Sequence, residues 1–206
     1  AIALNTIRLT ITIVLARLLS PTDFGLIATL SIFIGLSETL VSGGFASALI
    51  QKLNITNEDY STVFITNLGI SITIYLLLFI FSPSIAGFFN EPSLESITRV
   101  VALVIIFNSI GIVQRISLRR DLNFKVLAIV NTFSTIVSGA IGVLMAYYGF
   151  GVWSLVAQLT LKAFITSTAF WVVGNLKIKM IFNLESFKDN FNFGYKLLLS
   201  SIIGTL

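Results

Sequence analysis

The 206-residue sequence has no cysteine, no histidine and only three prolines, and charged residues make up only 11% of it. Without cysteine there is neither a disulfide framework nor a thiolate metal site, and without histidine there is no imidazole to act as a general base. Soluble globular domains carry about 25% charged residues. These scarcities argue against a disulfide-stabilised domain, a thiolate metal site and a soluble domain of any kind.

Apolar residues, by contrast, make up 56% of the sequence, and the mean hydropathy is +0.98. They form runs long enough to cross a bilayer, which takes about 20 apolar residues for a hydrocarbon core of ~30 Å. An open sheet edge in hydrocarbon would leave backbone groups unpaired. We therefore expect an all-α fold, a polytopic transmembrane helical bundle without β-sheet.

Six complete spans and the start of a seventh are expected. The six-helix bundle would occupy residues 1–173, an amphipathic cytoplasmic linker residues 174–192, and a truncated seventh span residues 193–206. Because Ala1 already lies in an apolar segment and Leu206 stops in the middle of another, we expect a fragment of a larger protein. The expected spans are residues 2–19, 24–50, 61–81, 97–113, 126–148 and 152–173.

Proline marks two of the expected breaks between spans. In the hinge 20–23, Pro21 cannot continue a helix, and Thr22 and Asp23 can cap the helix that follows. The segment 82–96 contains the other two prolines and is expected to form a short interfacial helix.

Lysine and arginine in the loops predict the orientation, because cytoplasmic loops are enriched in both. If odd spans run outward, the outer loops hold only Arg17 and Arg99, which places the N-terminus in the cytoplasm. The net charge of +4 is then explained by basic residues in loops that flank the membrane. No nucleic-acid partner is expected. The inner loops would hold Lys52, the basic stretch 114–125 with Arg115, Arg119, Arg120 and Lys125, and then Lys177, Lys179 and Lys188.

Four charged residues fall inside expected spans: Arg8, Glu38, Lys162 and Lys196. A charge at mid-membrane costs about 2.5–3.5 kcal/mol on insertion scales and should therefore face protein or a water-filled cavity. Three of them belong to polar or small stripes at helical spacing, which keeps each stripe on one face. Lys196 lies near the cytoplasmic end of its span and can snorkel. The stripes are Asn5, Arg8 and Thr12; Ser31, Gly35, Glu38 and Ser42; Asn131, Thr135 and Ser138; and Ser154, Gln158, Lys162 and Thr166.

Helices with one polar face each can enclose a hydrophilic cavity. We interpret Arg8 and Lys162 as cations of a translocation path for an anionic, phosphate-linked substrate, with Asn5, Glu38 and Gln158 beside them. Glu38 could be a counter-ion for one cation or a proton site. The alternative is that the small polar residues only join helices to each other. No metal or cofactor is expected, and no glycine-rich phosphate loop followed by Lys-Ser/Thr is present.

Several segments resemble the polysaccharide transporter family, which contains the lipid-linked oligosaccharide (O-antigen) flippases of the multidrug/oligosaccharidyl-lipid/polysaccharide flippase superfamily. The resemblance covers nearly the whole chain, and the segments follow each other in the family's order. They are Leu15-Ala-Arg-Leu-Leu-Ser-Pro-Thr-Asp-Phe-Gly-Leu26, Gly44-Phe-Ala-Ser-Ala-Leu-Ile-Gln51, Asp59-Tyr-Ser-Thr-Val-Phe64, Pro83-Ser-Ile-Ala-Gly-Phe-Phe89 with Glu91-Pro92, Leu118-Arg-Arg-Asp-Leu-Asn-Phe-Lys125 and Gly149-Phe-Gly-Val-Trp-Ser-Leu155.

The resemblance implies the N-terminal lobe of a two-lobed flippase, with six of twelve to fourteen helices. Such proteins move undecaprenyl-pyrophosphate-linked sugars, including lipopolysaccharide precursors, from the cytoplasmic to the outer leaflet of the bacterial inner membrane. They work by alternating access, without ATP and without enzymatic chemistry. The implied partners are the lipid-linked oligosaccharide, membrane lipids and the second lobe. The family's substrate contacts do not transfer to single positions, because no sharp motif holds them.

Two other functions remain possible on the sequence alone. An ion-coupled multidrug antiporter of the same superfamily would favour acidic residues in its cavity, whereas cations outnumber Glu38 here. A membrane-embedded transferase normally needs histidine or clustered acids as base or metal ligand. This sequence has no histidine and no close acidic pair within a span.

Overall fold

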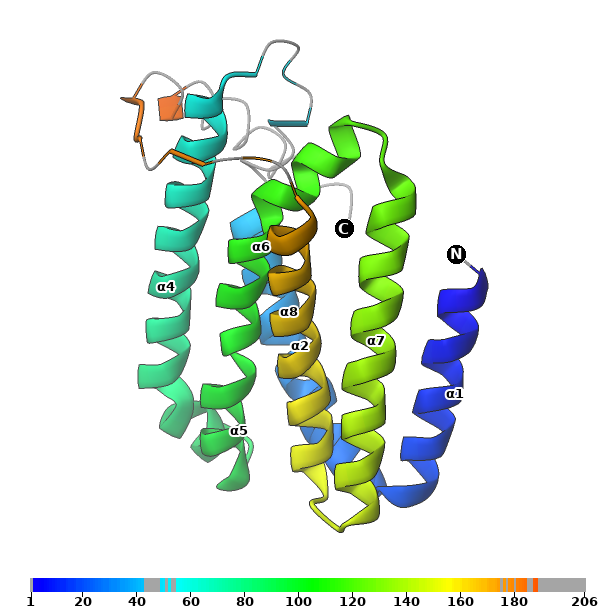
Figure 1. The fold of residues 1–206 in the computed structure, drawn as a ribbon. Coiled ribbons are helices and arrows are strands. Elements are labelled where there is room, and N and C mark those ends of the chain that lie inside the picture. Colours follow the sequence, from blue (N-terminus) through cyan, green and yellow to red (C-terminus); the bar gives the residue numbers. More distant parts are fainter. Residues whose placement is uncertain are drawn as a thin grey trace, which may run out of the picture.

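The computed structural model describes residues 2–42, 49–50, 52, 55–174, 176, 178–179, 181–184 and 187–188. Helices are the regular structure throughout these ranges, which contain no strand (Figure 1). The all-α expectation is therefore confirmed. The helices are α1 Ile2–Leu18, α2 Pro21–Ser42, α4 Asn57–Phe88, α5 Ser93–Val101, α6 Leu103–Arg120, α7 Phe124–Tyr147 and α8 Val152–Val173.

Five helical stretches among the described residues are long and apolar enough to cross a membrane, one fewer than the six expected. The expected span that is not among these five is 2–19, which corresponds to α1. α1 nevertheless lies against α7 within the bundle (Figure 1). The five stretches are Pro21–Val41, Asn57–Phe88, Ser93–Arg120, Phe124–Tyr147 and Val152–Val173.

The first hinge is capped by Ser20, not by Thr22 or Asp23 as expected. The Ser20 hydroxyl accepts a hydrogen bond from the Asp23 backbone N–H (3.2 Å), and the Asp23 carboxylate accepts one from the Ser20 backbone N–H (3.0 Å). This reciprocal pair is a capping box. Pro21 then takes the first position of α2, where its missing N–H costs nothing.

Pro83 does not end its helix, and the expected interfacial helix over 82–96 is wrong. α4 continues through Pro83 to Phe88. A proline inside a helix leaves the carbonyl four residues earlier, here that of Phe79, without its N–H donor. The Ser82 hydroxyl donates to this carbonyl at 2.8 Å. A side chain therefore replaces the lost backbone bond, which lets the helix run on.

The basic stretch 114–125 is mostly helix, not loop. Residues Ser93–Arg120 form one membrane-length stretch of α5 and α6, so the expected span 97–113 is too short at both ends. No proline or glycine interrupts residues 114–120, and Ile116 and Leu118 in this part are buried. The turn shrinks to residues 121–123, where the Asn123 side chain accepts a hydrogen bond from Val126 N–H and caps α7.

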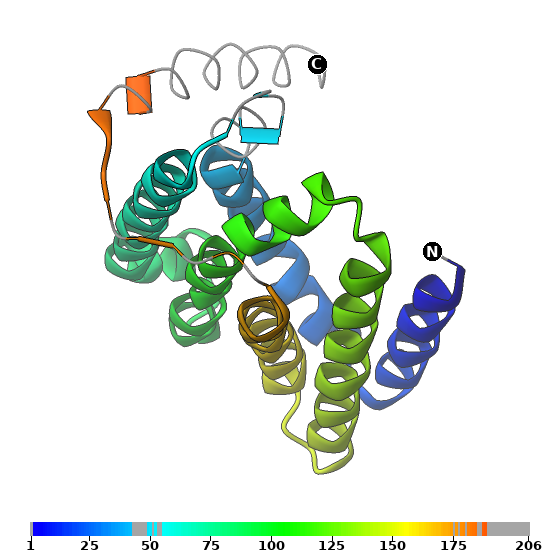
Figure 2. The same ribbon diagram turned by 45° about the horizontal axis from the view of Figure 1, so that its top comes forward.

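The helices pack with α7 between α1 and α8, while α8 also contacts α6 and α2 (Figures 1 and 2). Four of them meet in one apolar cluster, which we name the junction. It lies near the hinge that joins α1 to α2 and the tight turn between α7 and α8. In that turn Gly149 and Gly151 take positive φ angles of 81° and 53°, which glycine adopts without strain. The junction is formed by Leu15 and Leu19 of α1, Ala146 of α7 and Leu155 of α8, with Phe24 and Ile27 of α2 beside them.

The two ends of the bundle differ in charge, as expected. The hinge after α1 and the turn 149–151 lie at one end, the turn end, and the turn 121–123 and the described residues after α8 lie at the other, the basic end (Figure 1). Arg119 and Gly149 thus lie at opposite ends. Between them the helices expose large apolar side chains, which suit contact with lipid. These include Leu9, Ile32, Leu36, Ile80, Phe133 and Val172.

Candidate substrate path

Arg8 and Lys162 lie on the faces of α1 and α8 that lead to the junction. Arg8 precedes the buried Leu15 by seven residues, which places both on one side of α1. Lys162 follows the buried Leu155 by seven residues and shares its side of α8 in the same way. Arg8 is exposed and Lys162 is half-buried, and the charge of Arg8 acts on Lys162. The two cations therefore lie near each other, about two helical turns from the junction.

No carboxylate within the described residues forms an ion pair with Arg8 or Lys162; the two ion pairs found there lie elsewhere. Lys162 is the eleventh of the 22 residues of α8 and is therefore well inside its helix. Two like charges at this depth raise each other's energy in a medium of low dielectric. An anion of two or more charges placed between them would remove this repulsion.

Asn5 lies on the same helix as Arg8, and Gln158 lies on the same helix as Lys162. Asn5 is exposed, three residues before Arg8 on α1. Gln158 is half-buried, and its Cβ would lie 3.0 Å from a Cβ added to Gly142 of α7. Gln158 thus contributes to the close contact of α7 and α8, with its amide one turn from Lys162.

Many hydroxyl and amide groups of the expected stripes bond to their own helix backbone. Thr12 donates to the carbonyl of Arg8, and Ser31 to that of Ile27, in each case four residues earlier. Asn131 also donates to the carbonyl four residues before it. Such bonds satisfy the hydroxyl or amide donor inside the membrane without any partner helix. The polar groups of Thr12, Ser31 and Asn131 thus bond within their own helices.

Glu38 lies in another place, between α2 and α6. Its carboxylate accepts a hydrogen bond from Asn108 Nδ2 (2.5 Å), and its charge acts on Arg115. These residues line a cavity of about 70 Å³, together with Ser109, whose buried hydroxyl has no hydrogen-bond partner. The cation beside Glu38 is thus Arg115, which was expected in an inner loop.

Arg115 could have been found from the sequence. Asn108, Gly111 and Arg115 repeat at i, i+3 and i+7, the spacing that identified the other polar stripes. Arg115 lies beyond the expected span 97–113 but within α6, which runs to Arg120. A small second cavity of about 10 Å³ continues from Asn108 and Arg115 toward Thr166 and Ser167 of α8.

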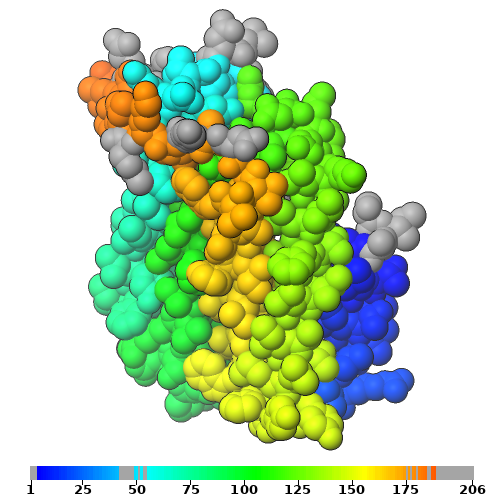
Figure 3. All heavy atoms as spheres, viewed as in Figure 1, coloured from blue at the N-terminus to red at the C-terminus, as the bar shows by residue number. Residues whose placement is uncertain are grey.

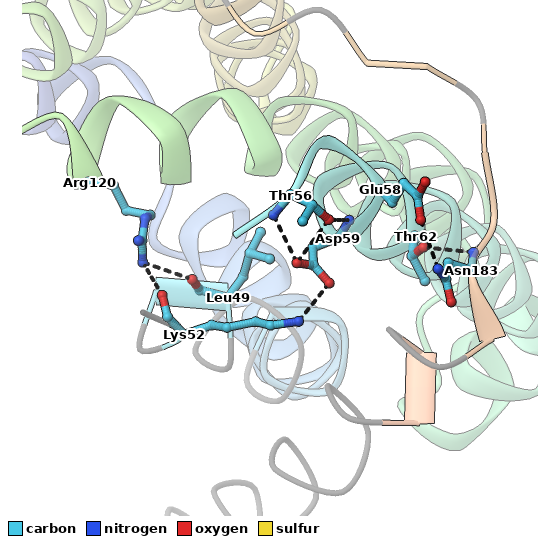
Figure 4. Close-up of polar contacts among 8 residues, drawn as sticks. All are labelled: Leu49, Lys52, Thr56, Glu58, Asp59, Thr62, Arg120 and Asn183. Atoms are coloured by element: carbon cyan, nitrogen blue, oxygen red, sulfur yellow. Dashed lines mark hydrogen bonds and ion pairs between the residues drawn. The ribbon is translucent and has the colours of Figure 1, made fainter. Parts of the chain in front are cut away.

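Most contacts at the basic end are structural (Figure 4). Arg120 donates from Nη1 to the carbonyls of Ile50 (2.9 Å) and Lys52 (2.7 Å), which holds the segment before α4 against the end of α6. Lys52 forms an ion pair with Asp59 (2.8 Å). Asp59 also completes the capping box of α4 with Thr56. Two of the expected loop cations therefore fix the shape of this end.

The described residues after α8 also pack on the basic end. Asn183 donates through its backbone N–H to the Thr62 hydroxyl (3.0 Å) and through its side chain to Glu58 (2.8 Å) (Figure 4). Gln114 Nε2 donates to the carbonyl of Leu176 (2.8 Å). Lys177, Lys196 and the expected seventh span 193–206 lie outside the described residues.

Long apolar helices, charged ends and cations between the helices define a multi-pass helical membrane protein. The chain belongs to the family described as "Polysaccharide biosynthesis protein", whose model matches residues 14–206. This agrees with the resemblance noted in the sequence. No solved structure matches the chain.

Three relatives carry names from cell-surface polysaccharide synthesis. The chain is 30% identical to the succinoglycan biosynthesis transport protein ExoT of Rhizobium meliloti over 92% of its length. It is 26% identical to the teichuronic acid biosynthesis protein TuaB of Bacillus subtilis over 82% of its length, and 26% identical to the lipopolysaccharide biosynthesis protein WzxC of Escherichia coli over 94%. The chain spans only 38%, 36% and 40% of these relatives, respectively.

Proposed function

We propose that the full-length protein is a flippase that moves lipid-linked oligosaccharide or polysaccharide precursors across the bacterial inner membrane. The observation that carries this proposal is the pair Arg8 and Lys162. The charge of Arg8 acts on Lys162, which lies in the middle of α8, and each cation shares a helix side with a buried leucine of the junction. The name of the relative ExoT, a biosynthesis transport protein, supports the same class of function.

A pyrophosphate-linked sugar fits the chemistry of this pair. To cross, the pyrophosphate must leave water and the headgroup layer, which is costly unless cations and hydrogen-bond donors replace its hydration. The guanidinium of Arg8 can bind two phosphate oxygens at once, and the ammonium of Lys162 adds a compact charge. The anion in turn removes the repulsion between the two cations. A cationic drug, by contrast, would be repelled by Arg8 and Lys162.

In this proposal residues 1–173 are one lobe, residues 174–192 are the linker, and residues 193–206 begin the first helix of a second lobe. Alternating access requires a second bundle that moves against the first around a shared site. The basic end faces the cytoplasm, and the N-terminus lies there too. The substrate, membrane lipids and the second lobe are the partners. Neither nucleic acid, a metal nor a cofactor takes part, and the protein catalyses no chemical step.

The proposal is tested by expressing the full-length protein in a bacterium that lacks its own flippase for lipid-linked sugars. We expect surface polysaccharide to return and the accumulated undecaprenyl-pyrophosphate-linked sugar to fall. Proteoliposomes with a fluorescent lipid-linked oligosaccharide give the direct measurement, as loss of the label from the outer leaflet. Export of a cationic dye without movement of the lipid-linked sugar would instead establish an antiporter.

A further inference from the structure

Arg115 is a half-buried arginine of α6 that lies in the walls of two cavities. A guanidinium has five N–H donors. Within the described residues, that of Arg115 forms neither a hydrogen bond nor an ion pair, although the opposite charge of Glu38 acts on it. Removing such donors from water is costly unless an acceptor replaces that water. Arg115 can therefore bind an acceptor that the described part of the bundle does not supply.

The cavity beside Arg115 is polar and has room for several water molecules. Its volume is about 70 Å³, whereas one water molecule needs roughly 10–15 Å³ of such space. Ser109 also lines this cavity, and its buried hydroxyl has no hydrogen-bond partner. Thr166 lines the smaller second cavity together with Arg115. A guanidinium and hydroxyl groups are suitable donors for phosphate oxygens, and Glu38 is the one carboxylate that lines either cavity.

The cavity between α2 and α6 lies behind the face of the bundle that Figure 3 shows. On that face α4, α6, α8 and α7 lie side by side, and α2 contacts α6 and α8 from behind (Figures 1 and 3). Arg115 and Glu38 meet in this cavity from opposite helices. The site is thus in the interior between α2, α6 and α8, and phospholipids against the face shown do not reach it.

Arg115 lies between the basic end and Lys162. The helices α6 and α8 run side by side toward the basic end (Figures 1 and 2). Gly111 of α6 lies level with Ser167 of α8, since a Cβ added to Gly111 would be 3.1 Å from the Ser167 Cα. From this level Arg115 is four residues, or about 6 Å, nearer to the basic end. Lys162 is five residues, or about 7.5 Å, nearer to the turn end. An anion that enters from the basic end therefore meets Arg115 first.

On the basis of the proposed function, we infer that Arg115 is a separate site that binds the phosphate groups of the substrate before they reach Arg8 and Lys162. Glu38 keeps binding at this site weak enough for release. A path through a membrane needs sites that are strong enough to be entered and weak enough to be left. Arg119, exposed one helical turn nearer to the basic end, adds a positive charge that acts on Arg115, and Glu38 opposes both.

The test measures binding of radiolabelled undecaprenyl pyrophosphate to the full-length protein in phosphatidylcholine nanodiscs. Arg8→Ala and Lys162→Ala are present throughout, so that the Arg115 site is measured by itself. We expect Arg115→Gln to weaken binding at least fivefold and Glu38→Gln to strengthen it at least threefold. When Arg115→Gln is present, Glu38→Gln should have no further effect, because the anion no longer binds beside it. Lys125→Gln is the control, which removes an exposed cation at the same end and should change binding less than twofold.

Two further measurements identify the ligand and exclude a purely structural effect. Sodium pyrophosphate should displace the probe, whereas a tenfold excess of phosphatidylglycerol, with a single phosphate charge, should not. Arg115→Lys, which keeps the charge, should bind the probe at least twice as tightly as Arg115→Gln. Unchanged or weaker binding in Glu38→Gln, unchanged binding in Arg115→Gln, or displacement by phosphatidylglycerol would each overturn the inference.

Transport, measured with Arg8 and Lys162 intact, separates this site from the proposed function. Arg115→Gln should slow movement of a lipid-linked sugar at least fivefold, and Glu38→Gln should also slow it, because tighter binding delays release. If the unmodified protein transports and neither variant is slower, Arg115 is not on the path and the flippase function stands. If the unmodified protein does not transport, the function is wrong, and the binding measurements alone decide whether Arg115 is an anion site.

Discussion

Charged side chains inside the bundle follow two different arrangements. Arg8 and Lys162 are like charges, the charge of Arg8 acts on Lys162, and neither forms an ion pair with another described residue. Glu38 and Arg115 are opposite charges, with Asn108 bonded to the carboxylate. The first arrangement is an unfavourable interaction that a bound anion would relieve. The second is already neutral, and it links α2 to α6.

Replacing Arg8 or Lys162 by Ala in the full-length protein should lower the rate of lipid-linked sugar movement at least tenfold, because the anion loses half of its counter-charge. Membrane insertion should not change. Arg17→Ala is the control, since Arg17 is an exposed cation near the other end of α1. Flipping in vesicles and protein level in membranes are the measurements. Lys in place of Arg8 retains activity if charge alone matters and loses it if a two-oxygen contact is required.

Glu38 and Arg115 should be energetically coupled. Glu38→Gln and Arg115→Gln should each lower the thermal unfolding temperature in detergent, because each removes the opposite charge that acts on a half-buried ionised side chain. The double variant should be less destabilised than the sum of the two, by about 1 kcal/mol. Additive effects of the two substitutions would show that the pair does not join α2 to α6.

At the scale of the helices, single side chains decide where each element begins and whether it continues. Ser20 caps α2, and the reciprocal bonds of Thr56 and Asp59 cap α4. Ser82 supplies the bond that Pro83 removes from α4. Ser82 also accepts from Arg99 Nε (2.9 Å), whose guanidinium lies 4.7 Å from the centre of the Phe79 ring. This contact fixes α5 beside the proline turn of α4.

Ser82→Ala should destabilise the protein by about 1–2 kcal/mol, because the Phe79 carbonyl and Arg99 Nε each lose a partner. In a Pro83→Ala background the cost should be smaller, since the backbone N–H at 83 then bonds the Phe79 carbonyl. The comparison comes from the free energy of unfolding in detergent, measured for the unmodified protein, the two single variants and the double variant. The same cost in both backgrounds would mean that the Ser82 hydroxyl does not compensate for the proline.

For the molecule as a whole, the segregation of charge between its ends is the observation from which an orientation in the membrane is proposed. Arg119, Lys125 and the described lysines Lys179 and Lys188 are at the basic end, whereas Arg17 and Arg99 are toward the turn end. Because the basic end also receives the chain after α8, any second lobe would be joined from that side. The same end is therefore proposed to face the cytoplasm and to carry the linker.

The absence of cysteine in these 206 residues makes the orientation easy to measure. In a full-length protein made cysteine-free elsewhere, Tyr148→Cys at the turn end should react with a membrane-impermeant maleimide in intact spheroplasts. Lys125→Cys at the basic end should react only after permeabilisation. Both side chains are exposed, so burial does not bias the comparison. The reverse labelling pattern would place the basic end outside.

Periodicity and composition were sufficient for the fold class, for the ends of α7 and α8 to within two residues, and for the separation of the basic and turn ends. These properties follow from the length of apolar runs and from local turn chemistry, both of which a sequence displays directly. The positions of Arg8, Glu38 and Lys162 inside helices were equally visible, because a charge within an apolar run stands out.

The tertiary structure alone decided which charges meet. It placed Arg115 beside Glu38 and Arg8 beside Lys162, pairs separated by 77 and 154 positions in the chain. It also carried α4 through Pro83, because the bond from Ser82 outweighs the usual tendency of proline to end a helix. Pairings between helices depend on how side chains pack between them, and periodicity within one helix shows only which face is polar, not which helix that face will meet.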